Sequence, residues 1–109
     1  MEIYYCIKQN QLEIEFVKFN SHLQKKIFLC SFDIGNHQIH LLQEFINQLY
    51  KNEESIYEEN GMILHYLPLY RLLIVYYNID NSTYTIHFER THIKNQWIQI
   101  LRKFIQSSS

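Results

Sequence analysis

Apolar and polar residues alternate with a period of two along the first third of the chain, which is typical of strands with one buried face. Residues 3–8 and 11–18 flank a two-residue connection at Gln9-Asn10 and predict an antiparallel hairpin. A third strand is expected at about residues 25–32, where apolar residues occupy both faces. That pattern predicts a position at the centre of its sheet.

The period then changes to that of a helix. Apolar residues recur at spacings of three and four, at Ile39, Leu42, Ile46 and Leu49. They predict a helix that Asp33 or Asn36 caps and that runs to about Lys51. Residues 51–61 carry four glutamates, one lysine and a closing glycine, so we expect a solvated loop or a frayed helix end there.

The second half of the chain has the same order of elements. Strands are expected over residues 62–66 and 70–77, interrupted at Leu67-Pro68-Leu69, and a turn over 78–82 leads to a strand over 83–90. Thr91 can cap a last helix with one apolar stripe, formed by Ile93, Trp97, Ile100, Leu101 and Phe104.

This βββα-βββα order predicts an α+β fold in a single domain, residues 1–109. We expect a two-layer sandwich, in which a mostly antiparallel sheet of about six strands packs against two helices. A shift of 72 residues aligns Tyr4-Tyr5 with Tyr76-Tyr77 without a gap. Residues 1–51 and 62–107 are therefore either a pseudo-repeat or alike by chance in a chain rich in Ile and Tyr.

Composition excludes several broad classes of protein. Hydrophobic residues make up 47% of the chain and there are only two Gly and one Pro, so a disordered or linker-rich chain is excluded. The N-terminus has no signal-peptide pattern and no apolar run is long enough to span a membrane, so we expect a cytoplasmic protein without membrane contact. In that compartment Cys6 and Cys30 are expected as buried free thiols, with a disulfide or a metal pair as alternatives.

Motifs for nucleotide, hydrolase and zinc-protease chemistry are absent from the sequence. Gly35 and Gly61 stand alone, which excludes a phosphate-binding loop, and there is no GxSxG, CxxC or HExxH pattern. We therefore expect no cofactor and no enzymatic activity. His37 and His40, with Cys30 or Asp33, have the spacing of a weak metal site, but a helix N-terminus facing water explains them better and no metal is expected.

A second cluster keeps one enzymatic alternative open. His87, Glu89, Arg90 and His92 supply a base, an acid and a cation, which are the groups of a metal-independent ribonuclease. The simpler interpretation is that His87 and Glu89 are the outward positions of an alternating strand.

The near-zero net charge of -1 hides a strong segregation of charge. Residues 28–89 contain eight acidic and two basic residues, whereas residues 90–109 contain four basic residues and no acidic one. The basic residues, Arg90, Lys94, Arg102 and Lys103, suggest nucleic-acid binding as an alternative function. The acidic stretch, with an aromatic residue inside it, suits docking on a basic protein surface, so the predicted partner-binding residues are Glu53, Glu54, Tyr57, Glu58 and Glu59.

Nine tyrosines support recognition, because a buried phenol needs a hydrogen-bond partner and nine are more than one small core accommodates. With EESIYEE at 53–59 and YYNIDNSTYTIHF at 76–88, the chain resembles the immunity proteins of bacterial polymorphic toxin and contact-dependent growth inhibition systems. The resemblance implies a cytoplasmic inhibitor that binds a cognate toxin domain, often a nuclease, and blocks its active or substrate-binding surface. Phage-borne inhibitors of host defence, such as anti-CRISPR proteins, share this size and composition and remain an alternative, and a homodimer is compatible with either.

Overall fold

A computed structural model describes residues 1–88 and 91–108 and has the expected α+β architecture. Seven strands and two α-helices follow one another in the order β1 Glu2–Lys8, β2 Gln11–Asn20, β3 Lys25–Gly35, α1 Ile39–Tyr50, β4 Ser55–Glu59, β5 Met62–Leu67, β6 Leu72–Tyr77, β7 Ser82–His87 and α2 Thr91–Ser108. A short 3₁₀ turn, Pro68–Tyr70, separates β5 from β6. The predicted interruption at Leu67-Pro68-Leu69 is thus confirmed. Pro68, which has no backbone N–H to donate to a neighbouring strand, is the first residue of the turn.

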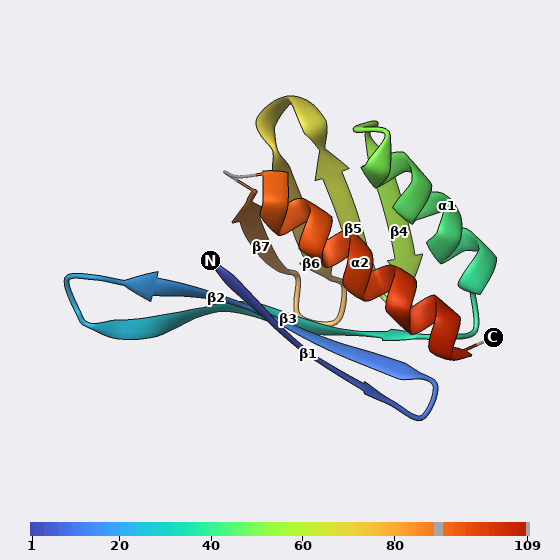
Figure 1. The fold of residues 1–109 in the computed structure, drawn as a ribbon, viewed down its shortest axis with the longest axis horizontal. Coiled ribbons are helices and arrows are strands. Elements are labelled where there is room, and N and C mark those ends of the chain that lie inside the picture. Colours follow the sequence, from blue (N-terminus) through green and yellow to red (C-terminus); the bar gives the residue numbers. More distant parts are fainter. Residues whose placement is uncertain (89–90, 109) are drawn as a thin grey trace.

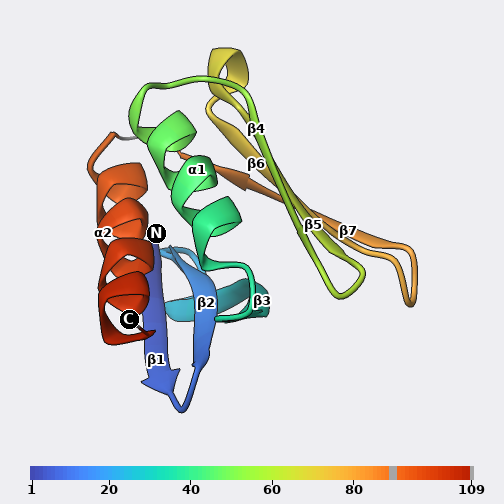
Figure 2. The ribbon, with the colours of Figure 1, turned by 90° about the vertical axis from the view of Figure 1, so that its right-hand side faces the viewer.

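The strands form two antiparallel sheets, of order β1-β2-β3 and β4-β5-β6-β7. The prediction of one sheet with about six strands is therefore wrong in detail, although the fold class is confirmed. Figures 1 and 2 show α1 and α2 side by side on one face of the four-stranded sheet, with the three-stranded sheet crossing one end of that layer. Each sheet thus buries one face, as antiparallel sheets commonly do.

The buried side chains of both sheets and both helices form one core. Trp97 of α2 lies at its centre, within 6.1 Å of the ring centroids of Phe16, Phe45 and Phe88. The apolar stripes predicted for the two helices are buried as expected, with Leu42, Ile46, Leu49, Leu101 and Phe104 all fully enclosed. A continuous core through all the layers explains why so short a chain folds with two small sheets.

Two predictions about the N-terminal half need correction. β3 is at an edge of its sheet and β2 is central. A register shift between Phe16 and Val17 also moves β3 out of simple alternation, and Phe28 is 57% exposed. Helix α1 begins after Gln38, which makes no side-chain cap bond, so neither Asp33 nor Asn36 caps it. The hairpin around Gln9-Asn10 is confirmed, with Lys8 paired to Gln11.

The segment 51–61 is also different from the expectation of a loop or frayed helix. Residues Ser55–Glu59 form strand β4, which pairs with β5 through a tight turn at Asn60-Gly61. Both turn residues have positive φ, 47° and 79°, a conformation that Asn and Gly adopt most readily. The exposed and buried residues of β4 alternate, so its glutamates do not all face water.

Candidate functional site: a groove beside strand β4

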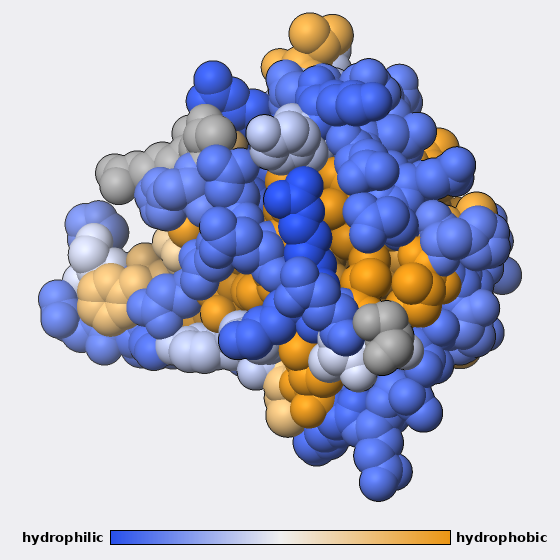
Figure 3. All heavy atoms as spheres, turned by 45° about the vertical axis from the view of Figure 1, so that its right-hand side comes forward, coloured by the Kyte–Doolittle hydropathy of each residue, from blue (hydrophilic) through white to orange (hydrophobic). Residues whose placement is uncertain are grey.

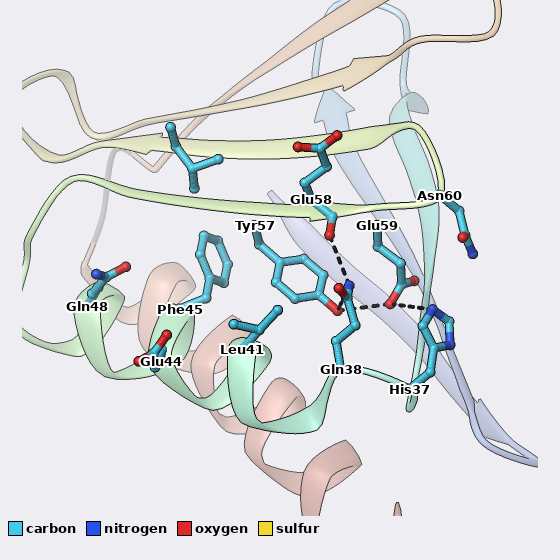
Figure 4. Close-up of a pocket in the computed structure, with 11 residues that line it drawn as sticks. His37, Gln38, Leu41, Glu44, Phe45, Gln48, Tyr57, Glu58, Glu59 and Asn60 are labelled. Carbon is cyan, nitrogen blue, oxygen red and sulfur yellow. Dashed lines mark hydrogen bonds and ion pairs between the residues drawn. The ribbon is translucent and has the colours of Figure 1, made fainter.

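A groove of about 560 Å³ lies between α1 and the outer edge of β4 (Figure 4). Leu41 and Phe45 of α1 form its apolar wall, and Tyr57 of β4 lies between the two elements. β4 is a terminal strand of its sheet, so its edge toward the groove pairs with no strand of the described chain. The groove therefore combines an apolar wall with an available strand edge.

A buried carboxylate fixes β4 at one end of this groove. The side chain of Glu59 is only 5% exposed, and its Oε1 accepts a hydrogen bond of 2.9 Å from the Tyr57 hydroxyl. Its Oε2 accepts one of 2.8 Å from the backbone N–H of Gly35, and Nε2 of His37 lies 3.5 Å from Oε1. These contacts join the end of β3 to β4, so Glu59 has a structural role.

Tyr57 is part of the same cluster and is also buried, at 3% exposure. Burial raises the pKa of its hydroxyl well above the usual value, and the hydrogen bond to Glu59 raises it further. The hydroxyl thus stays protonated and donates to the carboxylate. Tyr57 cannot be the exposed aromatic anchor that the sequence suggested, because its ring packs against Phe45 with centroids 5.8 Å apart.

Gln38 connects the start of α1 to the edge of β4. Its Nε2 donates to the backbone carbonyl of Glu58 at 2.9 Å, and it lies 3.4 Å from the Tyr57 hydroxyl. The Glu58 carbonyl therefore points toward the groove, whereas the Glu58 side chain points away from it (Figure 4). One acceptor on the β4 edge is thus occupied by a side chain.

The remaining predicted residues are exposed. Glu53, Glu54 and Glu58 all face solvent. Oε1 of Glu54 lies 2.7 Å from Nε2 of His65, within hydrogen-bond distance. Ile56, between them, is 60% exposed. The structure therefore divides the five predicted residues, with three carboxylates outside and Tyr57 and Glu59 inside.

Helix α1 adds a carboxylate that sequence analysis missed. Glu44 is exposed and lines the groove beside Leu41, which is 42% exposed. Within the described residues, Glu44, Glu53 and Glu58 form no ion pair. We call Glu44, Glu53, Glu54 and Glu58, together with Ile56 and Leu41, the acidic rim. Because Glu44 follows the buried Leu42 by two residues, the helical period already placed it on the exposed face of α1. Its position beside β4 depends on the fold.

The basic residues of α2 that suggested nucleic-acid binding have different surroundings. The Arg102 guanidinium lies over the Tyr50 ring, 5.1 Å from its centroid. Lys94 is buried, and its Nζ donates to the Leu49 carbonyl and to Asn52 Oδ1, both at 3.2 Å. Burial lowers its pKa, and nearby Arg71 lowers it further. Lys103 donates to the Tyr5 hydroxyl. Arg90 is outside the described residues.

An exposed basic surface is found instead on the hairpin of β2 and β3. No acidic residue occurs between positions 16 and 32, and this end of the hairpin extends away from the helices (Figure 1). Phe19 and Phe28 are 52% and 57% exposed, and Lys18 and Lys25 face solvent. The sequence contained this signal, but the prediction of β3 as a central strand concealed it.

The other candidate clusters are placed as follows. No group of three or more His, Cys, Asp or Glu residues in the described part of the chain is arranged to hold a metal ion. Cys6 is exposed, contrary to expectation, whereas Cys30 is buried, and both are free thiols. In the cluster that suggested a ribonuclease, His87 and His92 are exposed, and Glu89 and Arg90 are outside the described residues.

Polar side chains cover most of the face seen in Figure 3, with apolar side chains visible in patches between them. Within residues 1–88 and 91–108, neither helix is long and apolar enough to span a membrane. No family model, curated protein or solved structure matches the chain.

Proposed function

We propose that this protein is a protein-binding inhibitor, and specifically an immunity protein that neutralises a cognate bacterial toxin. The observation that carries the proposal is the acidic rim, where α1, β4 and the segment between them carry exposed carboxylates together with the exposed apolar residues Ile56 and Leu41. Specific protein interfaces commonly combine an apolar centre with a polar border, and complementary charge accelerates association. The rim thus fits a partner whose own surface is basic around an apolar contact.

A nuclease is the class of toxin that such a surface suits best. A nuclease must attract phosphate groups, so its substrate-binding surface carries Lys and Arg residues. An inhibitor that covers this surface gains affinity from carboxylates that occupy the positions of the phosphates. Glu53 and Glu58 are available for this purpose, because neither forms an ion pair within the described residues.

Co-expression tests the proposal directly. The product of the reading frame next to the gene for this chain is expressed in a bacterial host, with and without this protein, and growth is followed. We expect the neighbouring product to stop growth and this protein to restore it. A neighbouring product that is harmless, or that still stops growth in the presence of this protein, would refute the proposed function.

The site is tested with two charge-matched variants. Glu53→Lys combined with Glu58→Lys should abolish rescue and weaken binding of the purified partner. Glu13→Lys combined with Glu15→Lys changes the net charge equally on β2, a strand of the other sheet, and should leave both unchanged. Equal effects of the two variants would show that only net charge matters and would remove the assignment to the acidic rim.

The exposed hairpin end favours a second candidate function, the binding of single-stranded nucleic acid. Bases stack on exposed aromatic rings such as Phe19 and Phe28, and lysines such as Lys18 and Lys25 contact the phosphates. Fluorescence anisotropy with a labelled oligothymidine should then show binding that weakens with salt and is lost on Phe19→Ala with Phe28→Ala. Absence of binding at low salt would exclude this function.

A further inference from the structure

The edge of β4 offers backbone groups as well as side chains to a partner. The Glu58 carbonyl points into the groove, where Gln38 donates to it. In an antiparallel pair the residues along one strand alternate between pointing their N–H and C=O groups to one side and to the other. The N–H and C=O groups of Ile56, two residues earlier, therefore point to the groove side as well.

Among the hydrogen bonds of the described residues, a side chain occupies only one of these groups, the Glu58 carbonyl. Ile56 is 60% exposed and lines the groove, and β4 lies at the end of its sheet. In a soluble protein an edge strand of this kind either is protected from pairing or is used for it. The carboxylates on β4 and α1 disfavour pairing with a second copy of this chain, because like charges would then face one another.

We propose that an extended segment of the protein partner, with alternating basic and apolar residues, adds to β4 as a further strand. This inference rests on the proposed function and specifies how the acidic rim binds. Along the added strand, side chains on one face meet Glu54 and Glu58 and are basic. Those on the other face lie over Leu41 and Phe45 in the groove and are apolar. Backbone hydrogen bonds give affinity, and this alternation gives specificity.

The test uses a fluorescein-labelled, end-blocked peptide of four Lys-Val repeats and measures its fluorescence anisotropy with the full-length protein. A peptide of the same composition, with four lysines followed by four valines, is the matched control for charge and hydrophobicity. We expect the alternating peptide to bind at least about tenfold more tightly, which corresponds to roughly one net hydrogen bond. Failure of the alternating peptide to bind, or equal binding of the two peptides, would overturn the inference.

A variant of the protein removes the backbone donor without changing any charge. Ile56→Pro deletes the N–H that faces the groove, at an edge position where proline is tolerated, and Ile56→Val keeps it as the control. We expect Ile56→Pro to weaken peptide binding about tenfold and Ile56→Val to stay within about twofold of the wild type. Amide exchange provides a measurement that needs no variant, because bound peptide should slow exchange of the Ile56 N–H. Unchanged exchange at a saturating peptide concentration would contradict strand addition.

The same variant separates this inference from the proposed function. If Glu53→Lys with Glu58→Lys abolishes rescue in the growth assay while Ile56→Pro rescues fully, the acidic rim binds through side chains alone. Strand addition would then be wrong and the inhibitor function would stand. Loss of rescue in both variants, with rescue retained by Ile56→Val, is the result expected for strand addition.

Discussion

Glu59 is expected to contribute more to stability than any other carboxylate of β4. Glu59→Ala removes the acceptor of two hydrogen bonds, from Tyr57 at 2.9 Å and from the Gly35 N–H at 2.8 Å. A hydrogen bond to a charged group contributes about 1.5 to 3 kcal/mol, and the buried Tyr57 hydroxyl loses the acceptor of its hydrogen bond. We therefore expect the free energy of unfolding to fall by roughly 3 to 5 kcal/mol, a large part of the stability of a small domain.

Urea denaturation followed by fluorescence of Trp97, the single tryptophan, measures this loss as a lower midpoint with an unchanged slope. Glu58→Ala is the matched control, because it removes an exposed carboxylate from the next position of the same strand. It should change the free energy by no more than about 0.5 kcal/mol. Equal effects of the two substitutions, or a loss below about 1 kcal/mol for Glu59→Ala, would refute the assignment of Glu59 as a buried anchor.

Further predictions concern the core and the thiols. Trp97→Ala should lower the free energy of unfolding by about 3 to 5 kcal/mol, since the indole is fully buried against aromatic rings; a loss below about 1 kcal/mol would contradict this packing. Native protein treated with iodoacetamide should gain one label, at the exposed Cys6, and denatured protein two, as mass spectrometry will show; native labelling of Cys30 would be inconsistent with its burial. Burial raises the pKa of the Cys30 thiol from 9.0 to about 12, so the unfolded chain loses this proton first and stability falls as the pH rises above 9. Cys30→Val should reduce the decline measured by urea denaturation between about pH 8.5 and 9.5, where tyrosine, with an ordinary pKa of about 10, is still mostly protonated, and an unchanged decline would assign it to another group.

The strands and helices with clear periodicity could be predicted from the sequence. The alternation of Leu12, Ile14 and Phe16 specifies a buried face, and all three are buried as β2 pairs with β1. The i, i+3, i+7 spacing within α1 likewise matches its buried stripe. These elements follow local rules, so their neighbours in space are not needed to identify them.

Strand β4 could not be recognised with the same rule, although one local signal was present. Asn60-Gly61 followed by the apolar Met62 is a hairpin signature, and it places a strand directly before the turn. Four glutamates around it favoured a solvated segment, because an isolated carboxylate is rarely buried. Glu59 is buried only because Gly35, far away in the sequence, supplies a donor, and this partnership is a property of the fold.

The position of β3 at the edge of its sheet could not be predicted from periodicity either. The apolar run at Ile27, Phe28 and Leu29 satisfied the pattern of a central strand on both faces. In the structure a register shift beside Val17 redirects this part of β3, so Phe28 is exposed at the end of the hairpin. A bulge changes which residues face the core without changing the sequence pattern, so periodicity alone does not locate the edge of a sheet.

Glu58 and Glu59 lie on opposite faces of β4, so substitutions at these two neighbouring positions should have different effects. Glu59 and Tyr57 hold the strand against the end of β3, whereas Glu58 and Ile56 present charge and backbone groups to solvent. Reversing Glu58 should therefore change partner binding with little effect on stability, because its side chain faces water. Replacing Glu59 should lower stability and also loosen the strand edge, although no exposed carboxylate is lost. A partner that pairs with the backbone of β4 as well as with its charges will bind more weakly after either substitution. A partner that depends on charge alone will bind more weakly only after reversal of Glu58.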